Sequence, residues 1–169
     1  MSKLVLVTGG TRGIGAAIAK RLKDDGNEVI STFIGQEEAA KKYTEETGIK
    51  TYKFDVGYFE SCQKGIEEVE KSTGKTVDVL INNAGITKDR FLHKMSAEEW
   101  NAVINTNLNS VFNMTRCVIE KMRAKGYGRI ISISSINGIK GQIGQANYSA
   151  AKAGIIGFTK AVAQENANK

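Results

Sequence analysis

Three residues in the last third of the chain, Ser135, Tyr148 and Lys152, have the types and the spacing of a proton-transfer site. Tyr148 and Lys152 are four residues apart, so on a helix they share one face. A phenol is a poor acid at neutral pH, but a nearby ammonium favours the phenolate and lets the pair exchange a proton with a carbonyl substrate. Ser135 could hydrogen-bond the carbonyl oxygen and stabilise its developing charge. Because the Tyr–Lys spacing alone is common on protein surfaces, this interpretation needs support from the rest of the chain.

A glycine-rich turn near the amino terminus gives that support. Residues 8–15 read TGGTRGIG and follow the apolar run of residues 3–8. The glycine spacing is GxxxGxG and not the common GxGxxG, but the physics is the same, because glycine lets a pyrophosphate approach the positive end of a helix. Any tight turn favours glycine, so the position directly after a buried strand is what makes the signal informative. The predicted cofactor-binding residues in this turn are Gly9, Thr11, Arg12, Gly13, Ile14 and Gly15.

The end of the second predicted strand favours NADP over NAD. NAD-binding proteins usually carry an acid there that holds the ribose 2′-hydroxyl, but residues 31–35 read STFIG. Arg12 could instead pair with a 2′-phosphate; a turn residue that only faces solvent remains the alternative. Thr32, in this strand, is included in the predicted cofactor site.

Strand and helix patterns alternate along the whole chain. Strands are predicted at 3–8, 28–33, 50–55, 77–82 and 129–134, and helices at 16–25, 36–47, 59–73, 96–125 and 148–167. Ser96 and Glu99 form a capping-box pattern at the start of the long helix. Such alternation predicts a Rossmann-like, doubly wound α/β fold: a parallel sheet with helices on both faces. Ligands bind beyond the carboxyl ends of such strands, where Ser135 is expected.

Composition predicts one domain, residues 1–169, with 41% apolar and 25% charged residues, which is ordinary for a soluble protein. No apolar run approaches the ~20 residues that span a bilayer, and no signal-peptide core is present, so we expect a cytoplasmic protein without a membrane partner. Cys62, Cys117 and a single histidine support neither a disulfide framework nor a metal site. The net charge of +6 comes without a nucleic-acid-binding motif, so no nucleic-acid partner is expected; an ordinary basic surface and steering of polyanionic ligands both remain open.

Together these motifs resemble the short-chain dehydrogenase/reductase family, and the resemblance covers the whole chain. The matching pieces are TGGTRGIG at 8–15, NNAG at 82–85, Asn107, Ser135 and YSAAK at 148–152. The resemblance implies that Asn107 holds a water beside Lys152 in a proton relay and that Tyr148 and Lys152 also contact the cofactor. It implies a homo-oligomer, a tetramer paired through the long and last helices. It adds five residues to the predicted cofactor site: Asp55, Val56, Asn83, Ala84 and Gly85.

Residues 133–158 look like acetoacetyl-CoA reductases and, next, 3-oxoacyl-acyl-carrier-protein reductases. This resemblance implies NADPH-dependent reduction of a 3-oxoacyl thioester, with a CoA thioester favoured over a carrier-protein thioester. Residues between Ser135 and Tyr148 must border the substrate, although glutamines that merely belong to a loop remain the alternative. The predicted substrate-binding residues are Asp89, Ser135, Gln142, Ile143, Gly144 and Gln145.

The resemblance also concerns the carboxyl end. Members of the family continue with further strands and a lid, so the domain is expected to be truncated and its fifth strand to lie at a sheet edge. A chain ending at Lys169 is then expected to bind cofactor weakly and to turn over poorly. A non-catalytic cofactor-binding or assembly module is therefore the rival interpretation.

Overall fold

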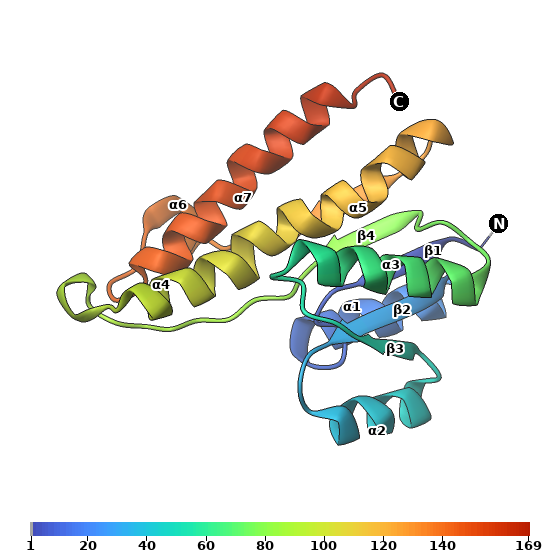
Figure 1. The fold of residues 1–169 in the computed structure, drawn as a ribbon, viewed down its shortest axis with the longest axis horizontal. Coiled ribbons are helices and arrows are strands. Elements are labelled where there is room, and N and C mark those ends of the chain that lie inside the picture. Colours follow the sequence, from blue (N-terminus) through green and yellow to red (C-terminus); the bar gives the residue numbers. More distant parts are fainter. Residues whose placement is uncertain (1) are drawn as a thin grey trace.

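A computed structural model describes residues 2–169 and contains a five-stranded parallel sheet (Figure 1). The strands are β1 (Leu4–Val7), β2 (Glu28–Phe33), β3 (Lys50–Lys53), β4 (Val79–Asn82) and β5 (Arg129–Ser132). Their order is β3-β2-β1-β4-β5, and every neighbouring pair is parallel. The chain therefore winds to one side of β1 and then to the other, which confirms the predicted doubly wound α/β fold.

Helices cover both faces of this sheet. Its central strand reads LVLV and is buried throughout, as a strand with two covered faces requires. Leu4 and Leu6 face a core shared with α3 (Phe59–Thr73) and α5 (Ser110–Ala124). Val5 and Val7 face a second core shared with α1 (Gly13–Asp24) and α2 (Glu37–Thr47). The alternation of side chains along β1 thus fixes which helix packs on which face.

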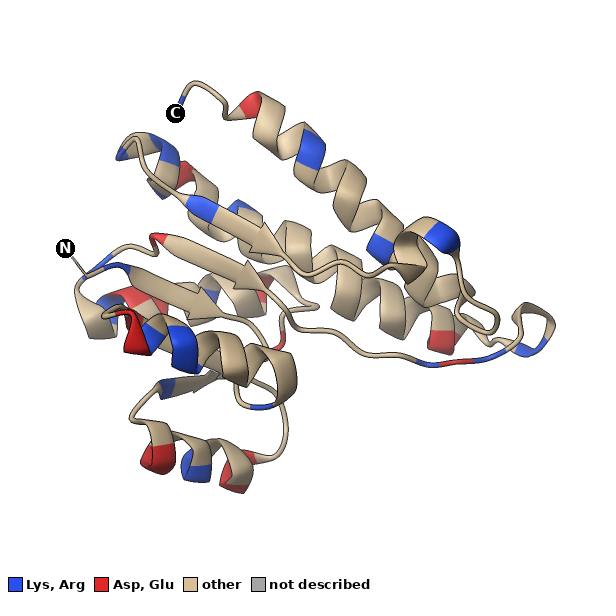
Figure 2. Ribbon diagram, turned by 180° about the vertical axis from the view of Figure 1, so that it is seen from behind, with Lys and Arg blue, Asp and Glu red and all other residues tan. Residues whose placement is uncertain are grey.

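The last helix, α7 (Ala146–Glu165), runs alongside α5 (Figures 1 and 2). Arg123 of α5 donates from Nη1 to the carbonyl oxygen of Glu165 at 3.2 Å. Beside them, β5 is an edge strand within the described part of the chain, as predicted, and its Ile131 is 49% exposed. Over residues 2–169 no helix has the length and apolarity needed to cross a bilayer.

The predicted uninterrupted helix 96–125 is wrong in its middle. It consists of α4 (Ala97–Ile104), a π-helical turn η2 (Asn105–Asn109) and α5, and the capping box of Ser96 and Glu99 is present as predicted. Asn107 donates from Nδ2 to the carbonyl oxygen of Val103 at 2.9 Å. An asparagine side chain that competes for backbone groups in this way favours a local departure from regular α-helix.

Three smaller differences concern helix boundaries and loops. The first helix begins at Gly13 and not at Ala16, so the glycine turn and the helix are continuous. Residues between Ser135 and Tyr148, expected to be a loop, contain the short helix α6 (Asn137–Lys140). A 3-10 turn, η1 (Leu92–Lys94), precedes α4.

Candidate active site

A cavity of about 560 Å³ lies at the carboxyl edge of the sheet, where β1, β2 and β4 end. This is the switch point at which doubly wound sheets bind ligands. It gathers twelve residues of the predicted cofactor site, namely Gly9, Thr11, Arg12, Gly13, Ile14, Gly15, Thr32, Asp55, Val56, Asn83, Ala84 and Gly85. Seven further residues line this cavity and were missed: Phe33, Ile34, Gly35, Gln36, Phe54, Ile86 and Thr106.

Asn83 locks the glycine turn against the end of β4. Its Nδ2 donates to the carbonyl oxygens of Thr8 at 3.0 Å and Gly9 at 3.2 Å. Gly9 has a φ of 60°, which favours glycine. A Cβ on Gly15 would lie 2.4 Å from the Asn83 amide nitrogen. Glycine at both positions therefore lets the turn and the β4 loop meet without a side chain between them.

The amino end of α1 is suited to an anionic group. Among the residues that the structure describes, no side chain caps this helix, and its first turn contains no acid. The first N–H groups of a helix have no intrahelical partner and carry the positive end of the helix dipole. Gly13 opens this turn, and a Cβ there would meet nothing within 4 Å, so the turn is open toward the cavity side. This arrangement fits the diphosphate of a dinucleotide.

The end of β2 carries no acid on the cavity wall. Ile34, Gly35 and Gln36 line it, and the nearest acid in sequence, Glu37, pairs with Lys53 instead. The hydrogen bond from Lys53 lowers the pKa of Glu37. Thr32 is only 1% exposed, and its Oγ1 accepts the N–H of Gly9 at 3.3 Å, so its hydroxyl supports the turn.

The predicted proton-transfer pair lies in the first two turns of α7. Lys152 is 5% exposed, and its Nζ lies 5.6 Å from the centre of the Tyr148 ring. The ammonium donates to the carbonyl oxygen of Ile133, just beyond β5, at 2.6 Å. Burial lowers the pKa of Lys152. The tyrosine and lysine therefore share one helix face beside the end of the fifth strand, as their spacing predicted.

Ser135 is held near α7 by the short helix that follows it. Its Oγ accepts the N–H of Asn137 at 3.2 Å. Gly138, one residue further, packs so closely on α7 that a Cβ would lie 2.7 Å from the backbone of Lys152 and Ala153. Helix α6 thus links the position of Ser135 to the helix that carries the predicted acid.

Asn107 is fully buried in the π-helical turn, at 0% exposure. Its Nδ2 donates at 2.9 Å to the carbonyl oxygens of Val103 and of Ile86, which lines the cavity. Its Oδ1 has no partner among the described residues and lies 2.5 Å from where a Cβ of Gly85 would be. A buried acceptor left open in this way is suited to a water.

Apart from Ser135, the predicted substrate-binding residues divide into two groups. Gln145 Nε2 donates to Asp89 Oδ2 at 2.8 Å, and the carbonyl oxygen of Gly144 accepts the N–H of Arg90 at 2.7 Å. Three of the predicted residues thus close the two loops on each other. The Gln142 side chain accepts a hydrogen bond from Lys140, and Ile143 is 79% exposed, so these two side chains lie at the surface.

Asn147, which forms hydrogen bonds at the edge of the candidate site, was not predicted from the sequence. Asn147 is 0% exposed and joins the start of α7 to the loop after β4 and to α4. Its position directly before Tyr148 was the available signal, but an asparagine at a helix start is also an ordinary capping residue.

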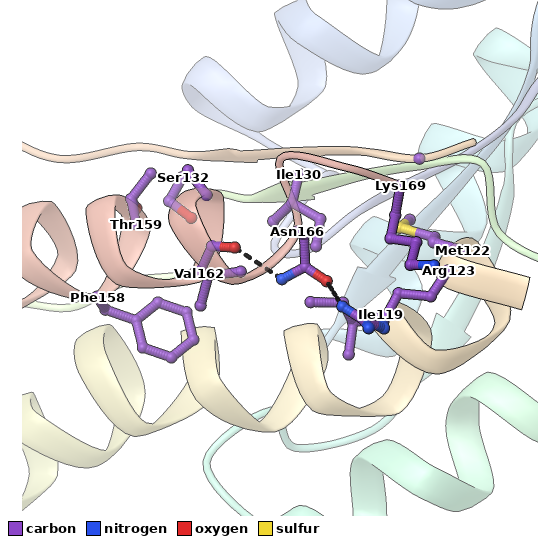
Figure 3. A pocket seen from close by; sticks show the side chains of 12 residues that line it. Ile119, Met122, Arg123, Ile130, Ser132, Phe158, Thr159, Val162, Asn166 and Lys169 are labelled. Carbon is purple, nitrogen blue, oxygen red and sulfur yellow. Dashed lines mark hydrogen bonds between the residues drawn. The ribbon is translucent and has the colours of Figure 1, made fainter. Parts of the chain in front are cut away.

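A second cavity, of about 210 Å³, lies between α5, α7 and β5 (Figure 3). Ile119, Ile130 and Val162 give it an apolar wall. It contains none of the predicted catalytic, cofactor or substrate residues, so it does not belong to the candidate active site.

Comparison with known proteins shows which family the chain resembles. Residues 3–169 match the short chain dehydrogenase family. The chain is 59% identical over 169 residues to the acetoacetyl-CoA reductase of Shinella zoogloeoides, with 100% of this chain and 70% of that protein covered. It is 56% identical to the acetoacetyl-CoA reductase of Rhizobium meliloti over 100% of this chain and 70% of the relative. A 3-oxoacyl-acyl-carrier-protein reductase of Vibrio harveyi is 44% identical, over 99% of this chain and 68% of the relative.

Proposed function

The chain belongs to the short-chain dehydrogenase family, and we propose that it reduces a 3-oxoacyl thioester with NADPH, acetoacetyl-CoA to 3-hydroxybutanoyl-CoA. The observation that carries the proposal is the juxtaposition of Tyr148 and Lys152 on α7 with Ser135 beyond β5. The names of the two most similar relatives given above support the choice of substrate.

The residues divide the chemistry between them. A bound nicotinamide dinucleotide would supply the hydride that the ketone carbon accepts. Tyr148 gives its phenolic proton to the ketone oxygen, which completes the alcohol. Ser135 donates a hydrogen bond to that oxygen while it gains charge. Lys152 returns a proton to Tyr148 and regains one from solvent through a water that Asn107 would hold; the open Oδ1 of Asn107 supports this relay.

The proposed cofactor is NADP. Two features support it over NAD: the β2 end of the cavity wall carries no acid, and Arg12 lines the same cavity. A guanidinium can hold a 2′-phosphate through charge-assisted hydrogen bonds.

For the acyl carrier, CoA is proposed over a carrier protein because the acetoacetyl-CoA reductases are the more similar relatives, at 59% and 56% identity against 44%. The ratio of kcat/KM for the two thioesters separates these alternatives. A carrier-protein thioester that reacts better than the CoA thioester would favour a 3-oxoacyl-acyl-carrier-protein reductase.

The family resemblance further supports a cytoplasmic homo-oligomer, a tetramer without nucleic-acid or membrane partners. Two exposed surfaces agree with subunit contacts. Phe112 of α5 is 50% exposed and stacks on Phe59 of α3, with ring centres 6.2 Å apart. Figure 2 shows few charges on α7, where Lys160 and Glu165 are the charged residues besides the buried Lys152.

The test is NADPH oxidation, followed by absorbance, with acetoacetyl-CoA and three proteins: wild type, Tyr148→Phe and Tyr127→Phe. Loss of the proton donor should lower kcat by about 10²- to 10⁴-fold, whereas NADPH affinity, measured by fluorescence, should stay nearly unchanged. Tyr127 contacts Lys3 far from the site and serves as the matched control. Retained turnover in Tyr148→Phe contradicts the assigned acid. A folded wild type that binds NADPH without oxidising it favours the non-catalytic module.

A further inference from the structure

Asn147 is a buried asparagine directly before Tyr148, and its contacts give it a specific task. We propose that Asn147 is a positioning residue, which fixes the main chain of Tyr148 against the loop after β4 and against α4. The inference rests on the proposed function, because it assumes that Tyr148 delivers the proton.

Both ends of the Asn147 amide are engaged by main-chain groups. Its Nδ2 donates to the carbonyl oxygens of Lys88 at 3.1 Å and Glu99 at 3.3 Å. Its Oδ1 accepts the N–H of Tyr148 at 2.7 Å. The reversed amide would set its oxygen against two carbonyl oxygens and its NH₂ against an N–H, so one orientation satisfies the site. The residue is 0% exposed, and solvent cannot readily replace these bonds.

The bond to Tyr148 ties down the free end of α7. Tyr148 lies in the first turn, whose N–H groups have no intrahelical acceptor. Gln145, at the cap position, forms no side-chain capping bond to the helix. The Asn147 side chain therefore supplies an acceptor that is itself anchored on two other segments.

Those two segments carry the rest of the candidate site. The loop that contains Lys88 runs back to Gly85 and Ile86 on the cavity wall. Helix α4, which contains Glu99, continues into the π-helical turn of Asn107. Lys152 has a separate anchor, the carbonyl oxygen of Ile133 at the end of β5. Tyr148 is thus coupled to the cofactor loop and to the relay through Asn147, independently of the lysine.

Other hydrogen bonds between the loop after β4 and the loop before α7 allow the positioning role of Asn147 to be tested separately from folding. The Arg90–Gly144 backbone bond and the Gln145–Asp89 bond join the same loops without Asn147. Removal of the Asn147 amide should therefore loosen Tyr148 while the two loops remain joined.

The test compares Asn147→Leu with Asn27→Leu. Leucine has the same branched shape and number of side-chain heavy atoms as asparagine and removes all three bonds. Because a small misplacement of a reacting group can cost about 10²-fold, we expect kcat with acetoacetyl-CoA to fall by about 10- to 100-fold at unchanged NADPH affinity. Asn27 also joins two segments, through Leu22 and the N–H of Lys3, but far from the cavity. Asn27→Leu should lower Tm and leave kcat unchanged.

Asn147→Asp supplies a pH readout that a purely structural role would not give. A protonated aspartic acid keeps the acceptor for Tyr148 and one donor, whereas the carboxylate would face two carbonyl oxygens. We therefore expect the ratio of variant to wild-type kcat to fall as pH rises through the carboxyl's titration. The neighbouring charged and titratable groups, Lys88, Arg90, Glu99, Tyr148 and Lys152, occur in both proteins and cancel in the ratio.

Each outcome decides the proposal. It is overturned if Asn147→Leu retains wild-type kcat, or if its kcat and NADPH affinity fall together. If Asn147→Leu fails to fold, a pH-independent ratio for Asn147→Asp overturns the proposal and a falling ratio supports it. If the wild type has no turnover, the proposed function fails separately. Hydrogen exchange then decides: the Tyr148 amide must exchange faster in Asn147→Leu, which lacks the acceptor, while residues 153–165 keep their protection.

Discussion

The Nζ of Lys152 donates a 2.6 Å hydrogen bond to the carbonyl oxygen of Ile133, and this bond ties the second turn of α7 to the end of β5. Burial of the ammonium lowers its pKa from the ordinary value of 10.5. The protein therefore holds the amine of the proposed relay at a position where charge is unfavourable for folding.

Replacement of Lys152 by Met should abolish turnover and change the pH dependence of stability. Between the lowered pKa and 10.5, the folded wild type binds fewer protons than the unfolded chain, so its free energy of unfolding rises with pH in that window. The variant lacks this contribution. In urea unfolding measured from neutral to alkaline pH, the free energy of unfolding of the wild type should increase relative to that of Lys152→Met as pH rises. A difference that stays constant or shrinks would contradict the buried-amine argument.

Gly138 should tolerate no side chain. A Cβ there would lie 2.7 Å from the backbone of Lys152 and Ala153, so α6 must move. Gly138→Ala should cost about 1–3 kcal/mol of stability and lower kcat, because Ser135 moves with α6. Gly157→Ala is the matched control within α7, since its Cβ meets nothing within 4 Å; it should stabilise the helix by about 0.5–1 kcal/mol. Equal Tm shifts in the two variants would disprove the close packing.

The fold was predictable because its strands and helices have local sequence signals. The buried LVLV of β1 and the helices closed by Gly48 and Gly74 follow from hydrophobic pattern and helix-end chemistry. The π-helical turn was not predicted, because residues 96–125 have the pattern of a continuous helix and one of the two Asn107 side-chain bonds goes to Ile86, which is distant in the sequence.

The candidate site was predictable where function restricts the residue type, as in the glycine turn and the Tyr148–Lys152 spacing. The site was less predictable where the task of a side chain is to position another residue. Gln145 and Asp89 are predicted to contact substrate, and the structure adds a bond between them that the sequence did not indicate. Asn147 was missed because its partners are main-chain carbonyls, which every residue type offers.

Arg12 should determine the preference for NADPH over NADH. If its guanidinium holds the 2′-phosphate, Arg12→Gln loses a charge-assisted interaction worth about 1.5–3 kcal/mol, or about 10- to 100-fold in NADPH affinity. Affinity for NADH should change little. Fluorescence titration with both dinucleotides measures the ratio, and Arg21→Gln, which removes an exposed arginine paired with Asp25 on the same helix, is the control. An equal loss for both cofactors would reject Arg12 as the phosphate ligand.

Asp78 should stabilise the sheet far from the site and in a pH-dependent manner. It accepts the N–H of Leu4 at 2.8 Å and the ammonium of Lys125 at 2.6 Å. Burial alone would raise its pKa, but these hydrogen bonds outweigh it and lower the pKa below 3.8. The stabilisation is therefore complete above the unfolded-state pKa and is lost as pH falls through the lowered one. Asp78→Asn should cost about 1–3 kcal/mol at neutral pH, at unchanged kcat. In urea unfolding, the difference in unfolding free energy between wild type and Asp78→Asn must shrink as pH falls below 3.8, because the wild-type carboxylate then also loses its charge. A difference that is the same at neutral pH and below 3.8 would show that the Lys125 pair contributes nothing.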